Sequence, residues 1–138
     1  MFGTKRGVIV LVVDTSVLIN NIRMVRTTSV LRMLDASLAT EILVGDVVLL
    51  EILQGARDES HAARLEAELR HFRIVPMLDP RIAIEAAANF RRLRGIGITV
   101  RKTMDLIIGT YCLMHGYALL HDDRDFDPMQ RHLGLRVA

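Results

Sequence analysis

The sequence contains no tryptophan, one cysteine and few aromatic residues. Aromatic side chains make up 4% of its 138 residues, so we expect an aliphatic core and no broad platform for stacking nucleic-acid bases. Cys112 lies alone in an apolar helical stretch, which predicts a buried thiol in a reducing compartment. No stretch approaches the roughly 18 apolar residues of a membrane-spanning helix, and the apolar run at 8–13 is shorter than a signal-peptide core. We therefore expect a cytoplasmic protein that contacts no membrane.

Neither sign of charge dominates the sequence. The 18 basic and 16 acidic residues give a formal net charge of +2, which neither requires nor excludes binding to nucleic acid. All but two of the basic residues are arginines. Arginine forms bidentate contacts with phosphate, although a genome that favours arginine codons would give the same composition. With 51% apolar residues, the chain is able to form one domain with its own core.

Short apolar segments alternate with longer segments of helical periodicity. The run at 8–13 is apolar without alternation, which is typical of a strand buried on both faces of a parallel sheet. Further strands are predicted at 41–44, 73–77, 117–120 and 135–137, and helices after Asp14, after Thr27 and at 47–54, 60–71, 80–93 and 104–115. This alternation predicts an α/β fold with a mostly parallel central sheet. Ligands of such sheets bind beyond the carboxyl ends of the strands, where Asp14 and an acidic loop at 121–127 are expected.

Three single acids stand within or beside apolar segments. Asp14 follows the first strand and either caps the next helix or belongs to a site. Glu51 lies in an apolar helix, where it either reaches solvent on a narrow polar stripe or points into a charged site, and we favour the site. Asp105 lies in the first turn of another apolar helix, where a favourable interaction with the helix dipole is the alternative to a role in a site.

The stretch 121–127 carries four carboxylates, those of Asp122, Asp123, Asp125 and Asp127. Such a group repels itself unless its members are solvated or share a cation. Together with the three single acids it favours a hard divalent cation, Mg²⁺ or Mn²⁺, held by carboxylate oxygens and water. Zinc is disfavoured because the five histidines are scattered without ligand spacing. One cation and two are both compatible with this acid count.

Four segments, in this order, resemble the successive motifs of PIN-domain nucleases, and most closely those of the VapC toxins of bacterial toxin–antitoxin pairs. They are 12–19 (VVDTSVLI), 51–55 (EILQG), 101–108 (RKTMDLII) and 119–126 (LLHDDRDF). The likeness covers nearly the whole chain from Val8. We therefore assign 8–138 to one PIN-like nuclease domain and 1–7 to a flexible N-terminal extension. The resemblance implies a three-layer α/β/α fold around the mostly parallel sheet.

The resemblance also implies the residues of the metal site. The catalytic ligands that it implies are Asp14, Glu51, Asp105 and Asp123, with Asp125 as a further ligand in or near the site. Within 121–127 only the motif alignment selects Asp123 as the fourth ligand, and the neighbouring acids Asp122 and Asp125 remain alternatives.

The hydroxyl that follows the first acid in this family falls on Thr15 or Ser16. We choose Ser16 as the residue that helps to hold a metal-bound water or a phosphate. Arg101 and Lys102, next to Asp105, are candidates for binding flanking phosphates of the substrate, and a solvated basic turn is the alternative.

The function implied by the resemblance is a metal-dependent endoribonuclease, with Mg²⁺ or Mn²⁺ as cofactor, that hydrolyses RNA phosphodiester bonds with metal-activated water. It would inhibit translation and growth as the toxin of a type II toxin–antitoxin system, as a homodimer with a cognate VapB-type antitoxin. A PIN-type nuclease of housekeeping RNA processing would have the same chemistry. An Asp-nucleophile phosphatase of the haloacid-dehalogenase kind is disfavoured because Ser16 stands where a second acid is expected. An inert RNA-binding or scaffold domain is disfavoured because all four acids are present.

Overall fold

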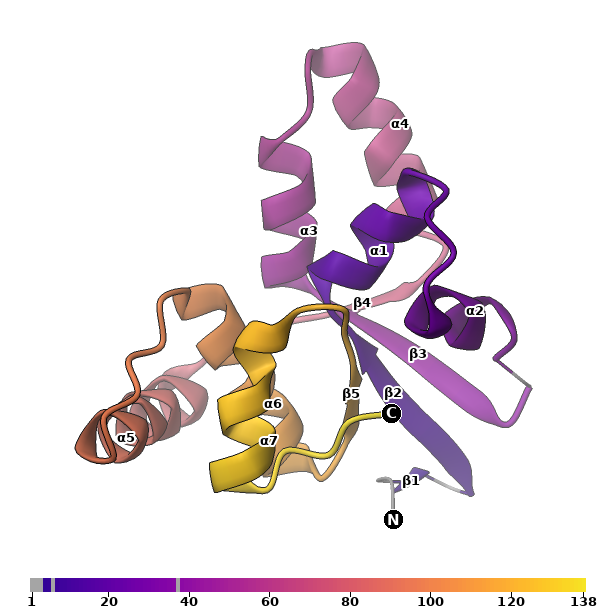
Figure 1. Ribbon diagram of the computed structural model, residues 1–138. Helices are drawn as coiled ribbons and strands as arrows, with labels where there is room; N and C mark the ends of the chain where they lie inside the picture. The colour runs from indigo at the N-terminus through magenta and orange to yellow at the C-terminus, as the bar shows by residue number, and fades with distance from the viewer. Residues whose placement is uncertain (1–3, 6, 37) are drawn as a thin grey trace.

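Strands and helices alternate along the chain, as the sequence predicts (Figure 1). The computed structural model describes residues 4, 5, 7–36 and 38–138. The strands are β1 (Thr4–Lys5), β2 (Val8–Val13), β3 (Thr40–Gly45), β4 (Arg73–Val75) and β5 (Ala118–Leu120). The helices are α1 (Thr15–Ile22), α2 (Thr28–Leu34), α3 (Asp46–Gln54), α4 (Glu59–Leu69), α5 (Pro80–Gly95), α6 (Thr103–His115) and α7 (Asp127–Leu133), with a 3₁₀ turn, η1 (Arg124–Phe126), before α7.

Strands β2, β3, β4 and β5 form a parallel sheet in the order β5-β2-β3-β4. The short strand β1 pairs antiparallel with the start of β2. This arrangement confirms the predicted fold class. It also places the ends of β2 and β5 side by side, because the Asp14 N–H donates to the Leu120 carbonyl over 3.0 Å. The chain that leaves β2 and the chain that leaves β5 therefore start at the same edge of the sheet.

Helices cover the sheet on both sides, which completes the three-layer fold. Figure 1 shows α1 and α2 on one side of the strands and α5, α6 and α7 on the other. Val10, Val12 and Val13 of β2 are fully buried, as the unbroken apolar run predicts, since both faces of this strand lie under helices. Cys112 is also fully buried and unpaired, as predicted.

Several boundaries differ from the sequence predictions. Strand β4 ends at Val75, two residues before the predicted end, because Pro76 has no N–H for the ladder. Helix α6 begins at Thr103, one residue before the predicted start, and Lys102 takes the N-cap position without a side-chain cap bond. The predicted strand at 135–137 is reduced to a single bridge between Val137 and Leu119.

Helix α7 is absent from the predicted elements. It begins at Asp127, the last residue of the stretch predicted as an acidic loop. Only 121–123 of that stretch is loop, because η1 occupies the next three residues. Seven residues give two helical turns, and of these only Met129 is buried. Such a short helix has too few apolar positions to show a period.

The predicted N-terminal extension, 1–7, falls partly outside the described residues, which omit 1–3 and 6. Its described part includes β1, and its flexibility stays a prediction. Among the helices of the described residues, none has the length and apolar character needed to cross a membrane.

Candidate metal centre

Asp14 joins the end of β2 to the start of α1 and is buried, with 3% of its surface exposed. One carboxylate oxygen, Oδ2, caps the helix by accepting from the Ser16 N–H at 3.0 Å and from the Ser16 hydroxyl at 2.6 Å. The other oxygen, Oδ1, is buried and has no hydrogen-bond partner among the described residues. The two interpretations of Asp14, cap and site residue, are therefore compatible, because each uses a different oxygen.

Glu51 reaches from α3 toward the start of α1. The Thr15 hydroxyl donates to Glu51 Oε1 over 3.0 Å. Burial raises the pKa of Glu51, the Thr15 hydrogen bond opposes the rise, and the negative charge of Asp14 adds to it. Glu51 is therefore close enough to Asp14 and Asp123 to interact electrostatically with both, and it lies on the charged side of an otherwise apolar helix.

Asp105 is a buried acid whose negative charge is only weakly compensated by neighbouring groups. It lies in the first turn of α6 with 4% of its surface exposed, and its Oδ2 atom is buried without a hydrogen-bond partner among the described residues. The nearest cation is the Lys102 ammonium, 3.9 Å from that oxygen. Burial, followed by the negative charge of Asp14, raises the pKa of Asp105 from 3.8 to about 7. The metal-free carboxyl is therefore partly protonated at neutral pH.

Two acids of the loop after β5 lie beside Asp105. One carboxylate oxygen each from Asp105, Asp123 and Asp125 lie within 4.8 Å of one another, the only such acid group found among the described residues. The Asp123 carboxylate is held by the Lys102 ammonium at 2.8 Å and by the Asp125 N–H at 2.9 Å. Partial burial alone would raise the pKa of Asp123, but the Lys102 and Asp125 contacts outweigh it and lower that pKa.

Asp122 points away from this group. Its carboxylate accepts from the Asn20 amide at 2.9 Å and from the Thr27 hydroxyl at 2.6 Å. These bonds outweigh partial desolvation and lower the pKa of Asp122. Its N–H donates to the Ser16 hydroxyl over 2.9 Å. Asp122 therefore ties the loop to α1 and to the start of α2, while its neighbour Asp123 faces Asp105.

The five predicted acids are not equally close to one another. Three form the tight group just described, whereas Asp14 and Glu51 lie beside it. Asp14 and Asp123 each raise the pKa of both Glu51 and Asp105, although burial is the larger cause in both cases. Burial, opposed by the Ser16 hydrogen bonds, also raises the pKa of Asp14.

A hard cation fits this donor set. The site has two buried carboxylate oxygens without partners and a net excess of negative charge, both of which a cation would relieve. Its donors are carboxylate oxygens only, with neither thiol nor imidazole in the tight group, which suits Mg²⁺ or Mn²⁺ better than zinc or copper.

Basic side chains border the acids. A hollow of about 230 Å³ beside the tight group is lined by residues that include Arg101, Lys102, Asp105 and Arg124. Arg101 is exposed there, as a phosphate contact requires. The Ser16 hydroxyl donates to Asp14 and accepts from the Asp122 N–H, so it orients the acid. The signal for this role is the Asx-type turn Asp14-Thr15-Ser16, which also places Thr15 against Glu51. The predicted contact of Ser16 with a metal-bound water or a phosphate stays a prediction.

Comparison with known proteins matches this sequence to one family. The PIN domain matches residues 11–131. The VapC ribonuclease Mb1587 of Mycobacterium bovis is 34% identical over 103 residues, which cover 72% of this chain and 75% of that protein, and the ribonuclease VapC11 of Mycobacterium tuberculosis matches with the same values.

Two solved structures have the same fold. The VapBC2 complex of Rickettsia felis bound to a DNA fragment from its promoter contains a chain that matches with a TM-score of 0.77 and 14% identity, over 94% of this chain and 98% of that one. The VapBC-1 complex of nontypeable Haemophilus influenzae contains one that matches with a TM-score of 0.74 and 14% identity, over 94% and 97%. The match over most of the chain and the 34% identity show that this protein belongs to the PIN-domain family and, within it, to the VapC ribonucleases.

Proposed function

We propose that this protein is a metal-dependent endoribonuclease that hydrolyses RNA phosphodiester bonds in the cytoplasm and acts as the toxin of a type II toxin–antitoxin pair. The observation that carries the proposal is the pair of buried, unpartnered oxygens, Asp14 Oδ1 and Asp105 Oδ2, beside two further acids. Burial of two such groups without a partner opposes folding by a few kcal/mol. A cation bound at this site would interact with both oxygens and offset this cost.

The residues that would hold Mg²⁺ or Mn²⁺ are Asp14, Glu51, Asp105, Asp123 and Asp125. Asp14 and Asp105 are our choices for direct ligands, and the other three bind directly or through water. When bound, such a cation lowers the pKa of a coordinated water and neutralises charge that develops on the phosphate.

The surrounding residues have their own parts in the proposal. Ser16 holds Asp14 with one oxygen engaged, which leaves the other oxygen directed into the site. Thr15 holds Glu51 in the same way. Arg101, exposed at the rim of the acidic site, binds a flanking phosphate of the RNA. The relatives named as ribonucleases support RNA as the substrate.

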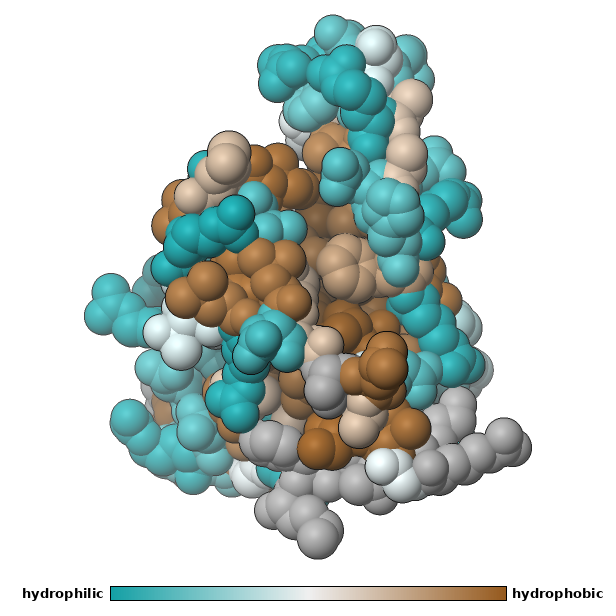
Figure 2. All heavy atoms as spheres, turned by 90° about the vertical axis from the view of Figure 1, so that its right-hand side faces the viewer, coloured by the Kyte–Doolittle hydropathy of each residue, from teal (hydrophilic) through white to brown (hydrophobic). Residues whose placement is uncertain are grey.

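A protein partner is supported by the surface. Figure 2 shows apolar side chains gathered over the face that carries α2 and the end of α1. The exposed apolar residues of this region are Ile22, Met24, Val25, Leu31 and Leu34. Apolar patches of this kind mark protein interaction sites. The solved structures with this fold are VapBC complexes, which supports a VapB-type antitoxin as the partner of this chain. We also propose that the chain forms a homodimer, as the family resemblance implies.

The test of the nuclease proposal is the Asp14→Asn variant, because asparagine is also a good N-cap residue and keeps α1 capped. Purified protein is incubated with total bacterial RNA and Mn²⁺ or Mg²⁺, with and without a chelator. We expect cleavage by the wild type with metal, and none by the variant or with chelator. A matched control is Asp35→Asn, which changes an exposed acid after α2. Full activity of Asp14→Asn would refute the site, and cleavage in the chelator would refute the metal.

The toxin role is tested by expression in cells. Induction of the wild type should arrest growth, induction of Asp14→Asn should not, and co-expression of the neighbouring antitoxin gene should restore growth. A wild type that is tolerated on overexpression, yet cleaves RNA in solution, would instead favour housekeeping RNA processing.

A further inference from the structure

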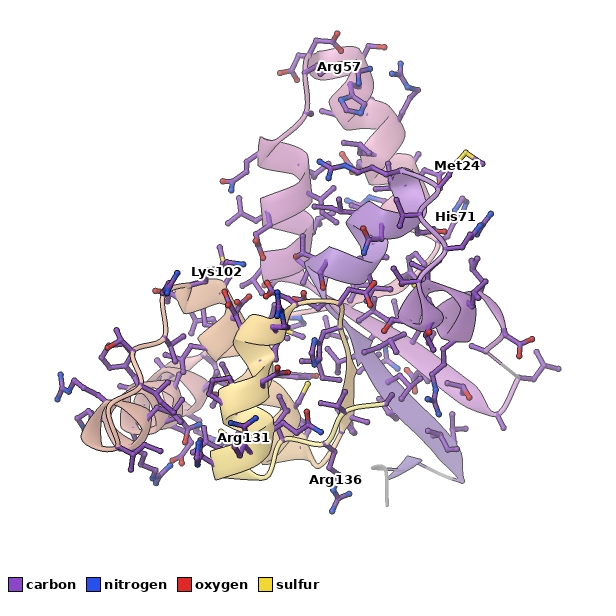
Figure 3. The ribbon with its side chains drawn as sticks, in the orientation of Figure 1. Met24, Arg57, His71, Lys102, Arg131 and Arg136 are labelled. Atoms are coloured by element: carbon purple, nitrogen blue, oxygen red, sulfur yellow. The ribbon has the colours of Figure 1, made fainter. Side chains whose placement is uncertain are left out.

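The Lys102 ammonium lies inside the acidic group. Its Nζ atom is 2.8 Å from Asp123 Oδ2, 3.5 Å from Asp125 Oδ2 and 3.9 Å from Asp105 Oδ2. Lys102 occupies the N-cap position of α6 (Figure 3). Its backbone therefore has a fixed place in the fold, while its long side chain extends over the carboxylates.

These three carboxylates are the same three whose oxygens lie close enough together to hold one ion. A divalent cation and an ammonium group cannot both occupy that space, because each needs the same oxygens within bonding distance and the two repel each other. The ammonium group also fits the position imperfectly. It bonds to Asp123, yet it leaves the buried Oδ2 atom of Asp105 without a hydrogen bond.

We propose that Lys102 is a built-in counter-ion of the metal centre, which neutralises the acidic group in the metal-free protein and is displaced when the divalent cation binds. This inference rests on the metal site of the proposed function. Its consequence is that Lys102 weakens metal binding, so that the protein loads its metal only above a threshold concentration. Once displaced, the ammonium lies at the rim of the site, beside the place where Arg101 is proposed to bind phosphate.

The presence of lysine rather than arginine at position 102 supports a cationic group that a metal ion can displace. The sequence has 16 arginines and two lysines, Lys5 and Lys102. An arginine would hold two carboxylates through a rigid, bidentate fork, whereas a lysine is a point charge on a flexible stem. Half of the Lys102 side chain, 51%, is exposed, so the stem has room to move toward solvent.

Mn²⁺ binding to the full chain at pH 8, measured by titration calorimetry, tests the inference. Removing one positive charge at this distance should tighten binding roughly tenfold in Lys102→Gln. Lys102→Arg should weaken binding relative to wild type, because the fork holds the acids more firmly. The control is Arg70→Gln, which removes an exposed cation paired with Glu66 on α4 and should leave the affinity unchanged.

Displacement is read directly in the wild type by NMR with isotope-labelled lysine. Only two signals are expected, and Mg²⁺ should shift that of Lys102 while Lys5 serves as the internal reference. This measurement needs no variant to fold.

Each outcome decides between the two proposals. Unchanged or weaker Mn²⁺ binding by Lys102→Gln, or a Lys102 signal that does not respond to Mg²⁺ while metal binds, would overturn the counter-ion role and leave the nuclease proposal intact. A wild type that binds no metal would overturn both.

Discussion

The Asp105→Asn substitution should stabilise the metal-free protein at pH 8 while it abolishes metal binding. Asp105 is buried with one oxygen unpartnered, and its charge lies near that of Asp14. Asparagine has nearly the same shape and no charge, so the substitution removes both the burial of an ion and the repulsion between acids. Stabilisation by removal of a catalytic ligand is what we expect where a site is arranged for a cation rather than for the fold.

The magnitude follows from the pKa of Asp105, which is raised from 3.8 to about 7. At 1.36 kcal/mol for each pKa unit, the charged form opposes folding by at most about 4 kcal/mol. The asparagine amide also needs hydrogen-bond partners in the same buried place, so we expect a net gain of about 1–2 kcal/mol.

The effect of Asp105→Asn on stability depends on pH. The carboxyl has its ordinary pKa in the unfolded chain and a raised one in the folded chain, so the folded state binds more protons between pH 4 and 7. The wild type therefore loses stability as the pH rises through this range. At pH 5 the folded carboxyl is protonated but the unfolded one is already ionised, so only about a third of the full penalty is present and the substitution should give no gain. At pH 8 it is ionised, and the gain is fully present.

Urea denaturation followed by far-UV circular dichroism, with a chelator present, measures this difference at pH 5 and pH 8. The control, Asp35→Asn, changes an exposed acid and should stay within about 0.5 kcal/mol of the wild type at both pH values. An Asp105→Asn variant that is no more stable than the wild type at pH 8 would refute the reasoning. Added Mn²⁺ should stabilise the wild type and leave the variant unchanged, since only a protein that binds the ion gains stability from it.

Three further predictions concern the groups around Asp105. The Asp122→Ala variant should lose about 1–2 kcal/mol of unfolding free energy in urea, because the Asn20 amide and the Thr27 hydroxyl lose their acceptor; full stability would contradict the structural role given to Asp122. Thr15→Val should weaken Mn²⁺ binding severalfold and Thr15→Ser should not, since the hydroxyl orients Glu51; calorimetry that finds both variants equal would exclude this positioning role. Metal affinity of the wild type should fall as the pH drops below 7, because protons compete for Asp105, and a flat profile between pH 6 and 8 would count against its place among the ligands.

Local sequence signals predicted most of the fold. The unbroken apolar run of β2 and the strand–helix alternation were enough to predict the parallel sheet. A strand that is buried on both faces is apolar throughout, whichever strands and helices pack against it. The start of α1 at Asp14 was also a local signal. Helix α7 had no such signal, since a helix of seven residues with one buried side chain has no measurable period.

The members of the acidic loop could not be told apart from the sequence. Asp122 and Asp123 are adjacent acids with the same chemistry, and their roles differ only through partners far along the chain. Asp122 is held by Asn20 and Thr27, which are 102 and 95 residues away. Asp123 is held by Lys102, 21 residues away. Only the motif alignment favoured Asp123, and the structure places this residue, with Asp125, against Asp105.

Asp105 carries more of the argument for a cation than Asp14 does, although both are buried. Asp14 has a sufficient structural reason for its position, because one of its oxygens caps α1 through two hydrogen bonds from Ser16. Asp105 caps nothing, since the N-cap of α6 is Lys102. Its interaction with the helix dipole is worth at most about 2 kcal/mol, less than burial of its charge opposes folding. The fold alone therefore does not account for an acid at position 105, and the counter-charge that would do so is only partly supplied by Lys102, 3.9 Å away.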